Sequence, residues 1–171
     1  MVFDASAKPH PLANSVNEYM YTGPSLQPLL WDILIRARVS THLVLADIQR
    51  AFLQIGVREE DRDAFRFLFN INGKELHLRY TRVPFGGKSS PFLLGATLNY
   101  HYDQQSEESQ ETVQALRENT YVDNLMQTGE EVEELEKFKR EATSVMESAK
   151  FPVHKWESDV EYLGKRRFNK P

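Results

Sequence analysis

Hydrophobic positions recur at helical spacing in three parts of the chain. After Gly23-Pro24-Ser25, apolar residues three and four apart predict an amphipathic helix entered through a Ser cap, namely Leu26, Leu29, Leu30, Ile33, Leu34 and Ala37. Ser90-Pro91 opens a second predicted helix, with Phe92, Leu93, Ala96 and Leu98. Thr128 and Glu131 form a capping box before the third and most regular stripe, made by Val132, Leu135, Phe138, Ala142, Val145, Met146 and Ala149.

Strand patterns lie between these helices. Residues 42–46 form an apolar run that ends at Asp47, and this predicts a buried strand. Phe65, Phe67 and Phe69, then Leu76, Leu78 and Tyr80, alternate with other residues around Asn72-Gly73, which predicts a β-hairpin. Residues 120–126 predict a tight hairpin with Asp123 at its tip, 151–156 and 160–163 predict two short closing strands, and 103–111 predict a loop or frayed helix end. This order predicts one α+β domain with an antiparallel sheet packed on helices.

Composition narrows the class of protein. The chain has 171 residues and no cysteine, which excludes disulfides, thiolate metal sites and a cysteine nucleophile. Its apolar runs are short and its start lacks the order of a signal peptide, so we expect an intracellular protein without a membrane span.

Charge is distributed unevenly along the chain. The net charge of −4 argues at first against a nucleic-acid partner. However, residues 1–100 hold 11 Lys/Arg against 9 Asp/Glu, whereas residues 101–171 hold 10 against 16. A phosphate-binding surface is therefore expected in the first part, where basic residues cluster: Arg50, Arg58, Arg62, Arg66, Arg79, Arg82 and Lys88. Ordinary solvated surface charge explains the same cluster equally well.

Two carboxylates stand at the end or the tip of predicted strands. These are Asp47 and Asp123, and an acid in such a place needs a partner, a cap or a metal ion. Oxygen ligands of this kind suit Mg²⁺, and a pair of metal ions can catalyse phosphoryl transfer. The structural alternatives are that Asp47 caps the next segment and Asp123 only shapes a turn.

Seven motifs in sequence order carry a resemblance to a known family. They are Val-Phe-Asp-Ala-Ser-Ala-Lys at 2–8, Gly-Pro-Ser-Leu at 23–26 with Ile-Leu-Ile-Arg at 33–36, Ala-Asp-Ile-Gln-Arg-Ala-Phe-Leu-Gln-Ile at 46–55, Asp-Arg-Asp at 61–63 with Arg-Phe-Leu at 66–68, Arg-Val-Pro-Phe-Gly-Gly-Lys-Ser-Ser-Pro at 82–91, Tyr-Val-Asp-Asn at 121–124, and residues 151–156. Together they resemble the fingers and palm of reverse transcriptases from LTR retrotransposons, most closely the BEL/Pao group. The resemblance implies a reverse-transcriptase-like palm over residues 1–171, with a fingers hairpin at about 60–83 and without thumb, connection or RNase H regions.

The resemblance also implies a role for individual residues. Asp47, the Ile48 carbonyl and Asp123 would hold Mg²⁺ or Mn²⁺ for nucleotidyl transfer, and Asn124 would be the degenerate second acid of the catalytic motif. The nucleotide would meet Ile48, Arg50, Ala51, Phe52, Phe85 and Gly86, with Phe52 excluding a 2′-hydroxyl. The RNA/DNA primer–template would meet Arg66, Arg79, Tyr121, Lys155 and Trp156. A core position for Phe52 and a merely buried Trp156 are the structural alternatives.

Departures from the family pattern keep a second function open. Asn124 stands where active relatives have an acid, and no basic residue precedes the motif at 2–8. The first hypothesis is a polymerase core, truncated and impaired by Asn124. The second is a domesticated, non-catalytic module that binds RNA or a protein partner, or that pairs with a second copy through exposed apolar surface.

Overall fold

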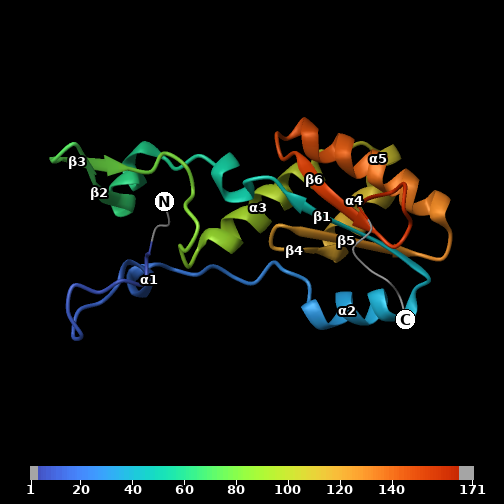
Figure 1. Cartoon of the computed structure of the whole chain (residues 1–171), viewed down its shortest axis with the longest axis horizontal. Helices are drawn as coiled ribbons and strands as arrows, with labels where there is room; N and C mark the ends of the chain where they lie inside the picture. The colour runs from blue at the N-terminus through green and yellow to red at the C-terminus, as the bar shows by residue number, and fades with distance from the viewer. Residues whose placement is uncertain (1–3, 166–171) are drawn as a thin grey trace. The chain divides into compact units, whose positions relative to one another are not determined.

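The structure, a computed structural model, describes residues 4–165 (Figure 1). Two compact units make up this part of the chain: residues 4–25 with 52–94 form unit 1, and residues 26–51 with 95–165 form unit 2. The boundary falls within helix α3 (Ser90–Asp103). Val2 and Phe3, from the first motif, lie outside the described residues.

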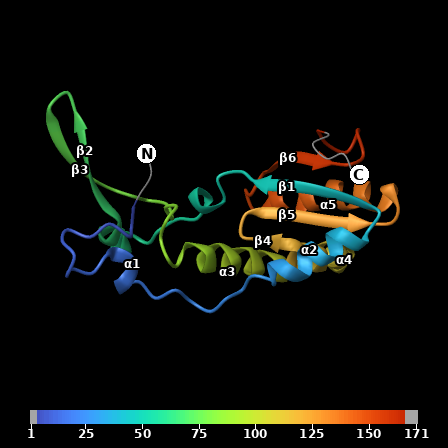
Figure 2. The same cartoon turned by 60° about the horizontal axis from the view of Figure 1, so that its bottom comes forward.

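Unit 2 is built on a four-stranded antiparallel sheet. Its order is β4 (Thr120–Tyr121), β5 (Asn124–Gly129), β1 (His42–Ile48) and β6 (Val153–Ser158). Each neighbouring pair is antiparallel, and Figure 2 shows the strands side by side. The predicted α+β class and the hairpin at 120–126 are confirmed. The strand that carries Asp47 is also confirmed, and it continues one residue further, to Ile48.

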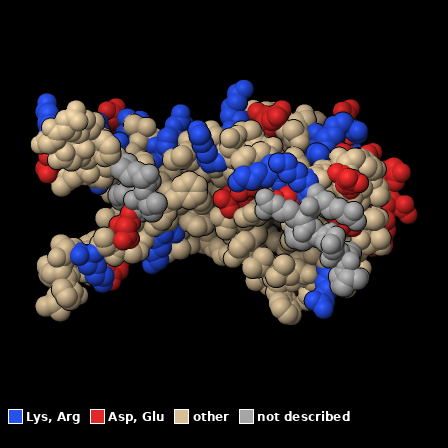
Figure 3. Space-filling model, in the orientation of Figure 1, with Lys and Arg blue, Asp and Glu red and all other residues tan. Residues whose placement is uncertain are grey.

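Alternation along β1 decides which face of this sheet is buried. Val44, Ala46 and Ile48 are buried, while Leu45 and Asp47 are partly exposed and point to the other face. Helix α5 (Val132–Ser148) contacts β1, β5 and β6, and α4 (Gln110–Asn119) contacts β5. The predicted apolar stripe of α5 is confirmed as core, with Leu135, Phe138, Ala142, Val145 and Met146 buried. On the face seen in Figure 3, acidic side chains gather over α5.

The predicted start of the first long helix is wrong. Helix α2 spans Leu30–Val39, with Leu29 and not Ser25 at its N-cap. Pro28 disfavours helical backbone at Gln27, so the preceding residues stay extended. Gln27 has another use in this conformation, because its Oε1 accepts the backbone N–H of Val122 at 2.7 Å.

Three further predictions in unit 2 need correction. Thr128 lies in β5 opposite Leu43, so it is a strand residue and does not cap the helix. The N-cap of α5 is Glu131. Residues 160–163 form turns and not a strand, because local hydrogen bonds such as Val160 N–H to Ser158 Oγ fold them back. The segment at 103–111 contains a short 3-10 helix, η3 (Glu107–Ser109), and α4 begins at Gln110 where no helix was predicted.

Unit 1 carries the predicted hairpin. Strands β2 (Arg66–Ile71) and β3 (Lys74–Arg79) pair in register from Arg66 opposite Arg79 to Ile71 opposite Lys74. Asn72 and Gly73 both have positive φ, at 52° and 78°, as the two-residue turn requires. The unit also contains α1 (Val16–Tyr19) and η2 (Glu59–Phe65), whereas η1 (Ala51–Gln54) begins in unit 2.

The predicted helix at Ser90-Pro91 is confirmed and extends to Asp103 as α3. At its start, Ser90 is buried and its hydroxyl donates a hydrogen bond to the Pro84 carbonyl at 2.9 Å. Among the described residues, no helix is long and apolar enough to cross a membrane.

Candidate functional site

Asp47 and Asp123 lie at the same end of neighbouring strands in unit 2. Asp47 pairs with Asn124 in the register of β1 and β5, and Asp123 immediately precedes Asn124. The Ile48 N–H donates to the backbone carbonyl of Asp123 at 2.8 Å, which continues the ladder beyond this pair. The topology therefore brings together two acids that are 76 residues apart in sequence, 123 − 47.

The turn that presents Asp123 has an unusual backbone. Val122 has φ of 57°, although a β-branched residue strongly disfavours the left-handed region. The hydrogen bond from its N–H to Gln27 Oε1 helps to hold this conformation. Such strain costs of order 1–3 kcal/mol and is typical of positions that serve a site. Sequence reasoning did not identify Gln27, because a side-chain contact between distant segments leaves no periodic signal.

The surroundings of Asp123 shift its pKa. Partial burial raises the pKa of Asp123, and the nearby negative charge of Asp47 raises it further, while Lys155 opposes the shift. Asn124 is exposed, and its amide Nδ2 donates to Asp123 Oδ1 at 3.0 Å. Asn124 thus adds an amide but no negative charge beside Asp123.

We predict that Asp123→Asn stabilises unit 2 near neutral pH. The folded-state pKa of Asp123 lies above its ordinary value, so the ionised carboxylate costs free energy in the fold, and this cost disappears as the pH falls through the folded pKa. Because Asp123 is partly exposed, the gain should be below about 1 kcal/mol at about pH 7 and should vanish near about pH 3. Urea unfolding at the two pH values measures it.

A matched control is Asp103→Asn, which removes one negative charge from an acid paired with Arg117 at 2.6 Å. It should give no gain at neutral pH. An Asp123→Asn variant that is less stable than the parent at neutral pH would contradict this account of the site.

Strand β6 supplies two side chains that contact Asp47. His154 Nε2 lies 2.6 Å from Asp47 Oδ1, and Lys155 Nζ lies 3.9 Å from the same oxygen. A groove of about 190 Å³ runs along this region and is lined by Leu45, Ala46, Asp47, Asn124, Leu125, Lys155 and Glu157. Asp47, Asn124 and Lys155, which line this groove, were predicted as site residues from the sequence. His154, which contacts Asp47, was not predicted.

The donor set suits one kind of metal site. Among the described residues, no three His, Cys, Asp or Glu side chains are placed to hold a metal ion together. Mg²⁺, however, commonly takes only one or two carboxylates and completes its shell with water and substrate phosphates. Asp47 and Asp123 meet that requirement. The role of the Ile48 carbonyl stays a prediction; the residue is buried, with its N–H bonded to Asp123.

The other predicted site residues of unit 2 differ in exposure and in contacts. Arg50 is exposed with a positive φ of 54°, whereas Ala51 is fully buried. Tyr121 is on the surface, opposite Asn124 in the β4–β5 pair. Trp156 points to α5, where Lys139 Nζ lies 5.5 Å from its ring centroid. The predicted roles of these four residues stay predictions.

Unit 1 brings the predicted aromatic residues into contact. Phe52 and Phe85 meet edge to face with ring centroids 4.8 Å apart. Phe52 is buried, as the core alternative expected, and Phe85 is exposed. Gly86 has φ of 90°, which favours glycine, and its carbonyl accepts a hydrogen bond from Asn17 Nδ2 at 2.9 Å. Their contact with a nucleotide stays a prediction.

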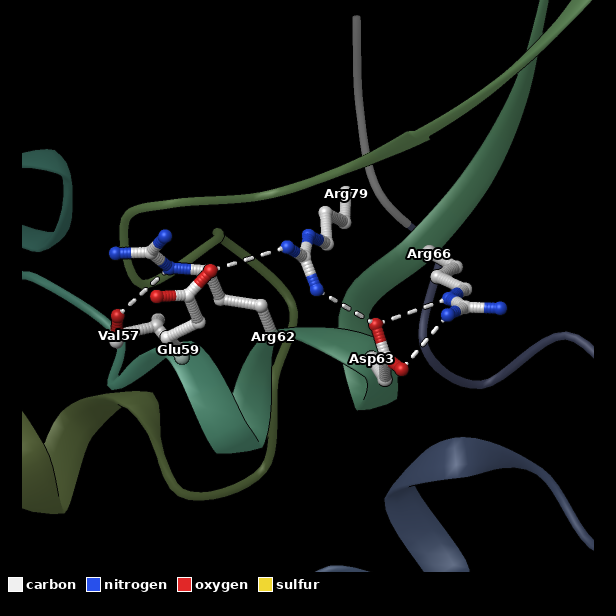
Figure 4. Close-up of polar contacts among 6 residues, drawn as sticks. All are labelled: Val57, Glu59, Arg62, Asp63, Arg66 and Arg79. Atoms are coloured by element: carbon white, nitrogen blue, oxygen red, sulfur yellow. Dashed lines mark hydrogen bonds and ion pairs between the residues drawn. The ribbon is translucent and has the colours of Figure 1, made fainter.

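The two arginines of the hairpin share one acid, as Figure 4 shows. Arg66 donates through Nε and Nη2 to the two oxygens of Asp63 at 3.1 and 2.7 Å, and Arg79 Nη1 donates to Asp63 Oδ1 at 3.0 Å. These bonds, first from Arg66 and then from Arg79, hold the pKa of Asp63 below its ordinary value. Glu59 adds a longer contact with Arg79, at 3.5 Å.

Asp63 therefore partly neutralises the surface that was predicted to meet template phosphates. The register explains the arrangement, because Arg66 and Arg79 are direct cross-strand neighbours. The acid was visible in the sequence within the Asp-Arg-Asp motif at 61–63, but only the folded hairpin shows that it binds both arginines.

Comparison with known families agrees with this geometry. A family model described as reverse transcriptase (RNA-dependent DNA polymerase) matches residues 8–164. No curated protein matches the chain. The match covers most of the sequence, and the chain belongs to the reverse transcriptase family.

Proposed function

We propose that this reverse transcriptase chain is the fingers and palm of a BEL/Pao-type retroelement polymerase that extends a primer along an RNA template. In this proposal unit 2 is the palm, and the β2–β3 hairpin of unit 1 belongs to the fingers. The observation that carries the proposal is the convergence of Asp47 and Asp123 at one end of the sheet. Nucleotidyl transfer needs carboxylates that hold metal ions beside the reacting phosphate.

Asp47 and Asp123 would hold Mg²⁺ or Mn²⁺ together with the Ile48 carbonyl. When bound, the metal would lower the barrier by activating the primer hydroxyl and by neutralising the departing phosphate charge. The chain's own residues orient the substrates. The exposed ring of Phe85 offers an aromatic surface for the nucleotide, and the buried Phe52 supports that ring edge to face. Gly86 permits close backbone approach.

The arginines of the hairpin would contact the template backbone. Asp63 uses two N–H donors of Arg66, and a guanidinium carries five, so a donor surface remains for phosphate oxygens. The strength of such contacts is reduced by the negative charge of Asp63 and Glu59 beside them. Binding to primer–template should therefore be weak and sensitive to salt.

A non-catalytic role is the second candidate, and two observations favour it. Asn124 removes one negative charge beside Asp123, and Asp63 pairs with both hairpin arginines. A chain of this kind keeps the fold but loses metal and phosphate affinity. Such a chain would bind RNA without catalysis, or it would bind a protein partner or a second copy of itself.

Primer extension separates the two functions. We expect Asn124→Asp to incorporate dNTPs on a DNA-primed RNA template with Mg²⁺ or Mn²⁺, and the parent chain to incorporate them more slowly, because the variant regains the missing carboxylate. Salt-dependent binding of primer–template is measured in parallel. Binding without incorporation by either chain would favour the non-catalytic module and would overturn the polymerase proposal.

A further inference from the structure

Strand β6 contains a β-bulge opposite the candidate site. Leu45 pairs with Glu157 and Asp47 pairs with His154, so only Ala46 lies between the pairs on β1 while Lys155 and Trp156 lie between them on β6. Lys155 has φ of 53°, which is rare for a residue other than glycine. A bulge of this type inserts one residue and changes the direction of the side chains that follow.

The bulge brings an imidazole and an ammonium group to one carboxylate oxygen. In a regular strand His154 and Lys155 would point to opposite faces of the sheet. Here His154 Nε2 lies 2.6 Å and Lys155 Nζ 3.9 Å from Asp47 Oδ1. Trp156 takes the helical face and packs beside Lys139 of α5.

We propose that His154 and Lys155 form a built-in clamp that occupies Asp47 Oδ1 and competes with a divalent cation for it. The inference rests on the assignment of Asp47 as a metal ligand under the proposed function. A metal ion that binds Asp47 Oδ1 must displace the imidazole of His154, and the ammonium of Lys155 repels it. The clamp lowers the metal affinity of the palm and keeps the acid paired until substrate phosphates arrive with the ion.

The charges around the site support this competition. Asp47 and His154 have side chains that are 31% and 33% exposed, so their contact is only partly screened by water. Lys155 is also close enough to Asp123 to oppose the rise of its pKa. One ammonium thus acts on both carboxylates that the metal would use, and Asn124 supplies no third negative charge to compensate.

Mn²⁺ binding tests the clamp directly. Free Mn²⁺ is counted by EPR during titration of the full chain and of His154→Ala, Lys155→Ala and the double variant. Each single change should raise the Mn²⁺ affinity by about fivefold, and the double change by more. Lys155→Ala removes one close charge contact in water, and His154→Ala removes a hydrogen bond to the carboxylate, which is of similar strength. His154→Gln retains an N–H donor and should change the affinity less than His154→Ala.

Two controls make the result specific. Lys137→Ala removes the same charge from α5, where Lys137 pairs with Glu111 at 2.5 Å, and should leave the affinity unchanged. Asp47→Asn, added to the double variant, should abolish its gain in Mn²⁺ affinity. Circular dichroism verifies that each variant is folded.

Each outcome bears on the inference. A gain in the His154 and Lys155 variants, absent in Lys137→Ala and lost with Asp47→Asn, supports the clamp. Mn²⁺ binding that depends on Asp47 but is indifferent to His154 and Lys155 overturns the clamp and leaves the proposed metal site standing. Absence of binding in every variant, the double one included, overturns both.

Discussion

Leu125→Ala should lower the free energy of unfolding of unit 2 by about 2–5 kcal/mol. Leu125 follows Asn124 on β5 and is only 2% exposed. It pairs with Ala46 on one side and with Thr120 on the other, so it lies inside the sheet and faces the helical layer. Neighbouring strands fix the backbone on both sides, and the cavity left by the lost methyl groups cannot easily collapse.

Tryptophan fluorescence in a urea titration measures this loss selectively. Both tryptophans of the chain, Trp31 and Trp156, belong to unit 2, so the signal reports on that unit. Leu34→Ala is the matched control, because Leu34 lies in the same unit but is 46% exposed. The control should lose less than about 1 kcal/mol. Equal losses in the two variants would show that the sheet does not form the core of this unit.

Local patterns predicted the elements that depend on local chemistry. The Asn72-Gly73 turn and the alternation around it suffice to specify a hairpin, because the turn geometry needs those residues. The stripe of α5 likewise follows from its spacing. The start of α2 could not be read in this way, since Leu26 and Leu29 continue the helical period while Pro28 and the contact of Gln27 with Val122 keep the segment extended.

The candidate site was predictable to the extent that strand ends carry it. Asp47 and Asp123 were found because Asp47 lies at the end of a predicted strand and Asp123 at the tip of a predicted hairpin. His154 was not, because the sequence does not reveal the bulge that brings both His154 and Lys155 to one oxygen. Asp63 was missed for a related reason. Its role appears only when cross-strand register places Arg66 beside Arg79.

Asp47→Asn in the Asn124→Asp background should reduce primer extension by at least about a hundredfold. A metal ion contributes several kcal/mol of transition-state stabilisation, and each 1.36 kcal/mol changes the rate about tenfold. Asn keeps the shape of the side chain but loses the charge that holds the cation. The substitution also leaves His154 and Lys155 without their anionic partner, so the positive charge of Lys155 remains beside the site and repels the metal further.

Single-nucleotide incorporation with saturating primer–template and dNTP measures this effect, with Mn²⁺ binding followed on the same samples. Asp103→Asn in the same background removes an equal charge from an exposed acid paired with Arg117 and should retain full activity. If Asp47→Asn keeps more than about a tenth of the rate while Mn²⁺ still binds, the metal site must lie on other residues. A parallel loss of binding and rate places the metal on Asp47, because the amide of Asn can accept a hydrogen bond yet cannot neutralise a divalent ion.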